Sequence, residues 1–92
     1  MSDVLDAANE IPAPIATAVL VHVVRSLVDD PEAVRVRAIE GRHRIKLEVT
    51  VGPGDLGRVI GRRGRTAQSI RTVVRAAATR DGVEVDVDFV DD

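Results

Sequence analysis

Between residues 59 and 71 the chain reads Val59-Ile60-Gly61-Arg62-Arg63-Gly64-Arg65-Thr66-Ala67-Gln68-Ser69-Ile70-Arg71. A four-residue Gly-x-x-Gly turn lies here between two segments whose apolar residues have helical spacing. The glycines allow a close approach that a Cβ would block, so a phosphate can reach main-chain N–H groups at the first turn of the following helix. Both middle residues are arginine, whose guanidinium group bonds phosphate oxygens in a forked geometry. The pattern predicts a clamp for a phosphate backbone.

Positive charge is concentrated around this turn although the 92-residue chain has a net charge of −2. The segment from 56 to 80 contains arginines and no acidic residue, and a polyanion responds to such a local patch rather than to the mean charge. We expect Arg58, Arg65 and Arg71 to extend the field of the two loop residues. Arg75 and Arg80 are predicted to belong to an ordinary solvated helix face.

The segments on either side of the turn are predicted from their apolar periodicity. The series Ile15, Val19, Val23 and Leu27 indicates a helix over about 14–28. Alternating apolar and polar residues indicate strands over about 34–37, 45–51 and 83–89, the first two joined by a hairpin turn at 40–43. A short helix is expected before Gly61, and a longer one after Gly64 that ends near 81.

The predicted order is therefore α-β-β-α-α-β, an α+β fold with a three-stranded mixed sheet and its helices packed on one face. Strands one and two are expected to be antiparallel, and a two-helix crossover would place strand three parallel to strand two. Glu84, Asp86 and Asp88 are interpreted as a charged sheet face beside basic residues such as Arg35, Arg37 or Lys46.

Length and composition restrict the function. Ninety-two residues suit a single domain, which we place at 13–92 after an acidic, disordered tail at 1–12. The chain has no cysteine, two isolated histidines and no nucleotide-binding or nucleophile motif. We therefore expect no metal, no cofactor, no small-molecule substrate, no membrane span and no enzymatic activity. The acidic start does not fit a targeting segment, so a cytoplasmic location is expected.

The motif residues resemble the KH domain, whose signature is matched by Ile60, Gly61, Gly64 and Ile70. The element order resembles the bacterial type II arrangement. Segments 26–29, 57–61 and 70–77 are similar to small single-domain proteins of the KhpA family, over about residues 14 to 90. This resemblance implies binding of RNA, self-association, and pairing with a larger KH-containing protein of the Jag type in the control of cell elongation and division.

The predicted RNA-binding function is that of a clamp for single-stranded RNA with low sequence specificity, in an RNA chaperone or post-transcriptional regulator. The chain has no Trp or Tyr on which bases could stack, so Val59 and Ile70 are expected to form an aliphatic groove wall. The predicted RNA-binding residues are Gly61, Arg62, Arg63, Gly64, Arg58, Val59, Ile60, Arg65, Ile70 and Arg71.

An alternative function belongs to another class, a scaffold that associates through its first helix and binds RNA weakly or not at all. That helix is more apolar than a solvent-facing helix normally is, and the predicted partner interface is Val19, His22 and Val23. The partner would be a second copy of the chain or a Jag-type KH protein. The RNA target, the dimer geometry and the pathway are left open.

Overall fold

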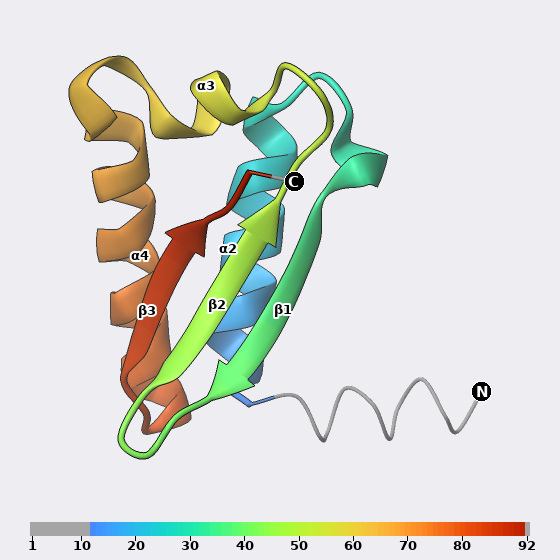
Figure 1. The fold of residues 1–92 in the computed structure, drawn as a ribbon. Coiled ribbons are helices and arrows are strands. Elements are labelled where there is room, and N and C mark those ends of the chain that lie inside the picture. The colour runs from blue at the N-terminus through green and yellow to red at the C-terminus, as the bar shows by residue number, and fades with distance from the viewer. Residues whose placement is uncertain (1–11, 92) are drawn as a thin grey trace.

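The computed structural model describes residues 12–91, so the predicted acidic tail lies outside the described residues except for Pro12 (Figure 1). The elements follow the predicted order, with two added 3₁₀ turns, η1 and η2. They are α2 (Pro14–Leu27), η1 (Pro31–Ala33), β1 (Arg35–Glu40), β2 (Ile45–Thr50), α3 (Leu56–Ile60), η2 (Arg62–Gly64), α4 (Arg65–Asp81) and β3 (Val85–Phe89).

Within residues 12–91 the strands form a three-stranded sheet in the order β1-β2-β3. β1 is antiparallel to β2, with Val36 opposite Val49, and β3 is parallel to β2, with Leu47 opposite Val87. Helices α2 and α4 lie together behind one face of this sheet, and α3 lies at one end of it (Figure 1). The predicted mixed topology and one-sided layering are therefore confirmed.

The core is formed where the alternating side chains of β2 meet the two long helices. Ile45, Leu47 and Val49 are buried, whereas Lys46 between them is exposed. Helix α4 contributes Ala67, Ile70, Val74 and Ala78 to the same core, and β3 contributes Val85 and Val87. Each large aliphatic side chain buried in this way contributes about 1.5–3 kcal/mol to folding.

The residues whose spacing predicted α2 are not the ones that the helix buries. Ala16, Leu20 and Val24 face the core, whereas Ile15 and Leu27 are 40% and 38% exposed. The helix is apolar over most of its circumference, so periodicity alone does not select the buried stripe. Packing against α4 decides it, and Ala16 is small enough to be fully buried there. None of the helices in the described part of the chain is long and apolar enough to cross a membrane.

A carboxylate from the end of α4 fixes the start of α2. The backbone N–H groups of Ile15 and Ala16 donate to the two carboxylate oxygens of Asp81 at 3.0 and 2.8 Å. These N–H groups belong to the first turn of α2 and have no partner within the helix. The carboxylate also lies at the positive end of the α2 dipole. Asp81 was predicted only as part of a turn, because the sequence does not show which helix start it reaches.

Candidate nucleic-acid interface

The Gly-x-x-Gly turn is a tight link between α3 and α4. The N–H of Gly61 donates to the carbonyl of Gly57 at 2.9 Å, and the N–H of Gly64 donates to the carbonyl of Gly61 at 3.2 Å. Both glycines have positive φ angles, 75° and 71°. Arg63 between them also has a positive φ, 59°, which costs a non-glycine residue roughly 1–3 kcal/mol. Such strain persists only where the surrounding structure imposes it, and here it lies in the predicted binding loop.

The two glycines are required for different reasons. A Cβ on Gly61 would overlap the Oγ1 of Thr66 and lie 2.6 Å from the Cβ of that residue. A Cβ on Gly64 would meet no atom of the described chain within 4 Å. Gly64 is therefore needed only for its backbone angle, whereas Gly61 is also needed because Thr66, in the first turn of α4, packs directly on it.

Three exposed arginines, which we call the loop arginines, surround this turn: Arg62, Arg63 and Arg65. They form no ion pair or side-chain hydrogen bond with any other residue between 12 and 91. Within that part of the chain their guanidinium groups have no partner, so a ligand could bond to them.

Helix α4 begins directly behind the loop arginines and adds a second attraction for anions. Its residues 65–81 follow Gly64, and no side chain of the described residues caps its start. The first-turn N–H groups and the positive end of the helix dipole favour negative charge at this position. The N–H of Arg65 donates to the carbonyl of Arg62, so phosphate oxygens could accept hydrogen bonds from the later N–H groups of this turn and from the arginines together.

Arg58 lies beside the loop but is held in ion pairs. Its Nη2 is 3.0 Å from an oxygen of Asp29, and its Nε is 3.4 Å from an oxygen of Asp55. The Asp55 side chain is buried and accepts N–H bonds from Asp29 and Asp30 at 3.2 and 3.1 Å. This network joins the end of α2 to the start of α3. The sequence does not show this role, because the N–H groups that Asp55 accepts from lie 25 and 26 residues away.

Arg71 is also held, at the free edge of β3. Its Nε donates to the backbone carbonyl of Val87 at 3.1 Å, and its Nη1 donates to Gln68 at 3.3 Å. The guanidinium group lies over the ring of Phe89, 5.4 Å from the ring centroid. The predicted contribution of Arg71 to the field at the loop is thus combined with a structural role between α4 and β3.

The predicted aliphatic groove wall is wrong for both of its residues. The side chains of Val59 and Ile70 are in the core, with 0% and 3% of their surface exposed. They hold α3 and α4 against the sheet, and a base could not contact them without opening the core. Ile60 is only half-buried and keeps some surface beside the loop.

The predicted partner interface on α2 is divided between two faces. Val19 and Val23 are half-buried and pack against the core, whereas His22 is exposed. A shallow hollow on the outer face of the helix is lined by Ala18, Val21, His22, Arg25 and Ser26. An interface on this helix would therefore be centred on His22 and Ala18.

Comparison with known proteins agrees with the fold. The family model for the KH domain of KhpA/KhpB matches residues 17–89. A protein of Leifsonia xyli is 56% identical over 73 residues, which are 79% of this chain and 93% of the relative. A protein of Halalkalibacterium halodurans is 44% identical over 70 residues, which are 76% of this chain and 92% of the relative.

A third relative, from Chlamydia trachomatis, is 40% identical over 73 residues, covering 79% of this chain and 94% of the relative. All three relatives carry the name "RNA-binding protein KhpA". The element order and mixed sheet of the structure are those of the predicted type II KH fold. On the family match and these relatives together, the chain belongs to the KhpA/KhpB family of KH-domain proteins.

Proposed function

We propose that this protein binds single-stranded RNA by its backbone, with phosphates held between the loop arginines and the start of α4. The observation that carries the proposal is the availability of these three guanidinium groups beside an uncapped helix start. The relatives are named RNA-binding proteins, and KH loops of this type clamp about four nucleotides. Two independent sources of positive potential thus coincide at one turn.

The proposed binding has low sequence specificity. Phosphate contacts fix the position of a strand but do not distinguish its bases. Phe89 is the only aromatic residue of the chain, and it is half-buried beneath Arg71, so an exposed stacking platform is lacking in the described part of the chain. Because Val59 and Ile70 are buried, they do not offer bases an aliphatic wall beside the loop.

The test is a double charge reversal, Arg62→Asp with Arg63→Asp, measured by fluorescence anisotropy on a single-stranded RNA. We expect affinity to fall at least about tenfold, since each variant residue loses a charge-assisted bond and repels a phosphate. The matched control is Arg25→Asp with Arg80→Asp, two exposed arginines on other surfaces with the same change in charge. Equal losses in both double variants, or no loss in a folded loop variant, would reject the clamp.

The proposed physiological role is that of a cytoplasmic RNA chaperone or post-transcriptional regulator. We propose that it acts with a larger KH-containing partner of the Jag type, as the resemblance implies. A backbone clamp without base readout suits such a role, because it accepts many sequences and leaves selection of the RNA to a partner.

A second candidate function is protein association through α2. It is favoured by the outer hollow around His22 and by the exposed side chains of Ile15 and Leu27. Ala18→Glu is the appropriate variant, since a charge at Val19 or Val23 would disturb the core. If association is the main function, sedimentation shows a dimer that survives the loop variant and dissociates in Ala18→Glu. A monomeric protein that binds RNA would exclude this candidate.

A further inference from the structure

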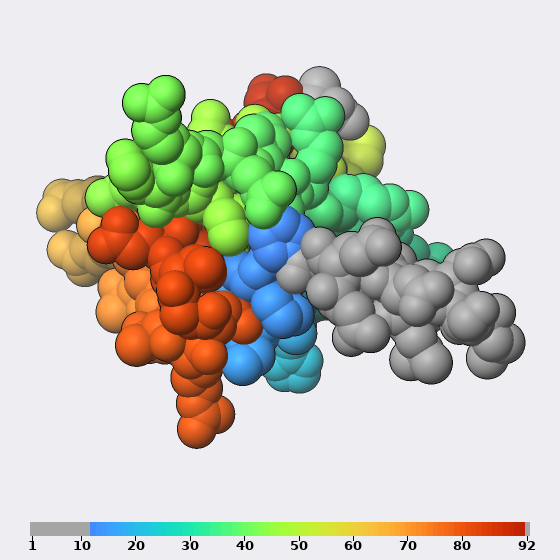
Figure 2. All heavy atoms as spheres, turned by 90° about the horizontal axis from the view of Figure 1, so that it is seen from below, coloured from blue at the N-terminus to red at the C-terminus, as the bar shows by residue number. Residues whose placement is uncertain are grey.

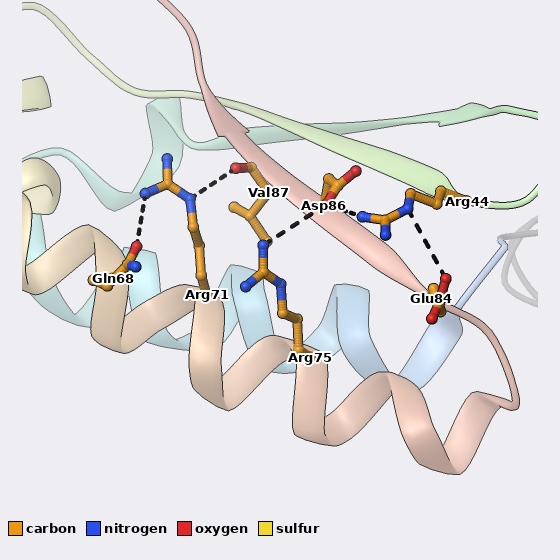
Figure 3. Close-up of polar contacts among 7 residues, drawn as sticks. All are labelled: Arg44, Gln68, Arg71, Arg75, Glu84, Asp86 and Val87. Atoms are coloured by element: carbon orange, nitrogen blue, oxygen red, sulfur yellow. Dashed lines mark hydrogen bonds and ion pairs between the residues drawn. The ribbon is translucent and has the colours of Figure 1, made fainter.

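One acidic side chain on β3 lies between two arginines that come from other elements (Figure 3). The Oδ1 atom of Asp86 accepts a bond from the Nη1 of Arg44 at 2.9 Å, and the Nη2 of Arg75 lies 3.7 Å from the same oxygen. Arg44 comes from the β1–β2 hairpin and Arg75 from α4. A single carboxylate therefore brings together two guanidinium groups that are distant in sequence.

The same strand edge holds a third arginine, so we call Arg44, Arg71 and Arg75 the edge arginines. Figure 3 shows Arg71 and Arg75 reaching from α4 to β3, and Arg44 also pairing with Glu84, whose carboxylate oxygen lies 3.9 Å from the Nε of Arg44. The hairpin, the α4–β3 turn and the start of α2 meet at this end of the molecule, as Figure 2 shows in green, orange-red and blue. Arg71 and Arg75 lie along the middle of α4, whereas the loop arginines lie at its start.

We propose that Arg44 and Arg75 form a second phosphate contact for the same RNA strand, and that Asp86 occupies this contact until a phosphate displaces it. This inference rests on the proposed function. Carboxylate and phosphate oxygens are alternative partners for the guanidinium fork, so Asp86 holds the two groups as a phosphate would. The RNA phosphate would take the place of the Asp86 carboxylate between the guanidinium groups of Arg44 and Arg75, which are already close together.

The contact is accessible and weakly held. The side chains of Arg44, Arg75 and Asp86 are 57%, 53% and 41% exposed. Ion pairs with this exposure contribute little to stability and are screened by salt, so a phosphate can displace the carboxylate without unfolding any element.

The distance from the loop predicts how long an RNA must be to use the second contact. Ten residues of α4 separate Arg65 from Arg75, which is about 15 Å at the helical rise. A strand stacked at about 3.4 Å per nucleotide covers that distance in about five nucleotides. An RNA that fills only the loop, about four nucleotides, would therefore end before Arg75 and Arg44.

Asp86 should consequently reduce the affinity for long RNA and not for short RNA. The direct variant is Asp86→Asn, which keeps the shape of the side chain and removes its charge. Asp88→Asn is the matched control, because it changes the same charge on the same strand. Asp88 forms no ion pair with another residue between 12 and 91.

The experiment measures binding of both variants to single-stranded RNAs of about four and about twelve nucleotides, at several salt concentrations. We expect Asp86→Asn to raise affinity for the longer RNA about fivefold, and to steepen its log–log salt dependence by about 0.7 per added phosphate contact. Affinity for the shorter RNA should stay within about twofold, as should both affinities of Asp88→Asn. Adding Arg44→Gln and Arg75→Gln to Asp86→Asn should abolish the gain.

Two results would overturn the inference: equal gains from Asp86→Asn and Asp88→Asn, or a gain that is the same for both RNA lengths. Either would indicate a general effect of net charge. The loop charge reversal separates this inference from the proposed function, because it should weaken binding of both lengths. If it does so while Asp86→Asn has no effect, the second contact alone is rejected. If it leaves binding unchanged, the loop clamp itself is wrong.

Discussion

Arginines lie at the start of helix α4 and along its middle, and the two groups differ in what surrounds them. The loop arginines at its start form no ion pair within residues 12–91, whereas Arg71 and Arg75 bond to the edge of β3. The difference arises because β3 brings a carbonyl and a carboxylate next to the middle of the helix and neither next to its start. The arginines of α4 carry the same charge, but those beside β3 already have partners within the described residues. The position of β3 therefore decides which of them a ligand can bind most easily.

The largest effect should follow from a change that destroys the loop geometry. Gly61→Ala should destabilise the protein by about 3 kcal/mol, because the new Cβ overlaps Thr66 and the backbone keeps a positive φ. Urea unfolding measures this loss. Gly64→Ala is the control, and its cost should be only about 1 kcal/mol, since φ alone is unfavourable there. Equal costs at the two positions would contradict the described packing of Thr66.

The next largest effect is a difference in stability between two aspartate variants. Asp81 bonds to backbone N–H groups, whereas Asp86 pairs with arginines. Asp81→Ala should destabilise the protein by about 1–2 kcal/mol, because two N–H groups at the start of α2 lose their acceptor. Thermal or urea unfolding checks this value. Asp86→Ala should cost less than about 0.5 kcal/mol, since its pairs are exposed. A larger loss of stability in Asp86→Ala than in Asp81→Ala would contradict this prediction.

A third prediction compares one arginine from each group. Arg65→Ala should reduce RNA affinity about fivefold, whereas Arg75→Ala should change it less than about twofold, because Asp86 already occupies Arg75. Anisotropy titrations on one short RNA provide both numbers, and melting curves should show that each variant is folded. A larger loss of RNA affinity in Arg75→Ala than in Arg65→Ala would mean that a short RNA does not bind at the loop.

The smallest effect concerns Arg71. Arg71→Lys keeps the charge but loses the forked contact with Val87 and Gln68 and the stacking on Phe89. We expect a loss of about 0.5 kcal/mol in stability, measured by urea unfolding. Short-RNA affinity should be unchanged, and a loss of affinity without a loss of stability would instead place Arg71 in direct contact with the strand.

The fold was predictable where local patterns carry the information. Alternation along β2 identified Ile45, Leu47 and Val49 as its buried face, and the spacing of Ile70, Val74 and Ala78 identified the inner face of α4. Two glycines around two arginines predicted the position of the turn between α3 and α4. These features depend on neighbours in the chain, so periodicity and turn chemistry are sufficient.

The remaining features depend on contacts between distant segments. Asp55, Asp81 and Asp86 all bond to groups more than ten residues away. Lys46, one of the basic neighbours expected for the acidic face of β3, lies opposite Asp86 in the sheet, but the ion pairs of Asp86 are with Arg44 and Arg75. The buried stripe of α2 was missed because most of that helix is apolar. The groove-wall assignment failed because an apolar residue beside a functional loop is equally suited to the core, which is where Val59 lies.

The most direct test of the loop as the RNA site is an NMR titration of the isotopically labelled protein with a single-stranded RNA of about four nucleotides. We predict that the largest amide shifts occur at residues 61–67, which include the loop arginines and the first turn of α4. Shifts concentrated around Ala18 and His22 on α2, with the loop amides unchanged, would contradict the account.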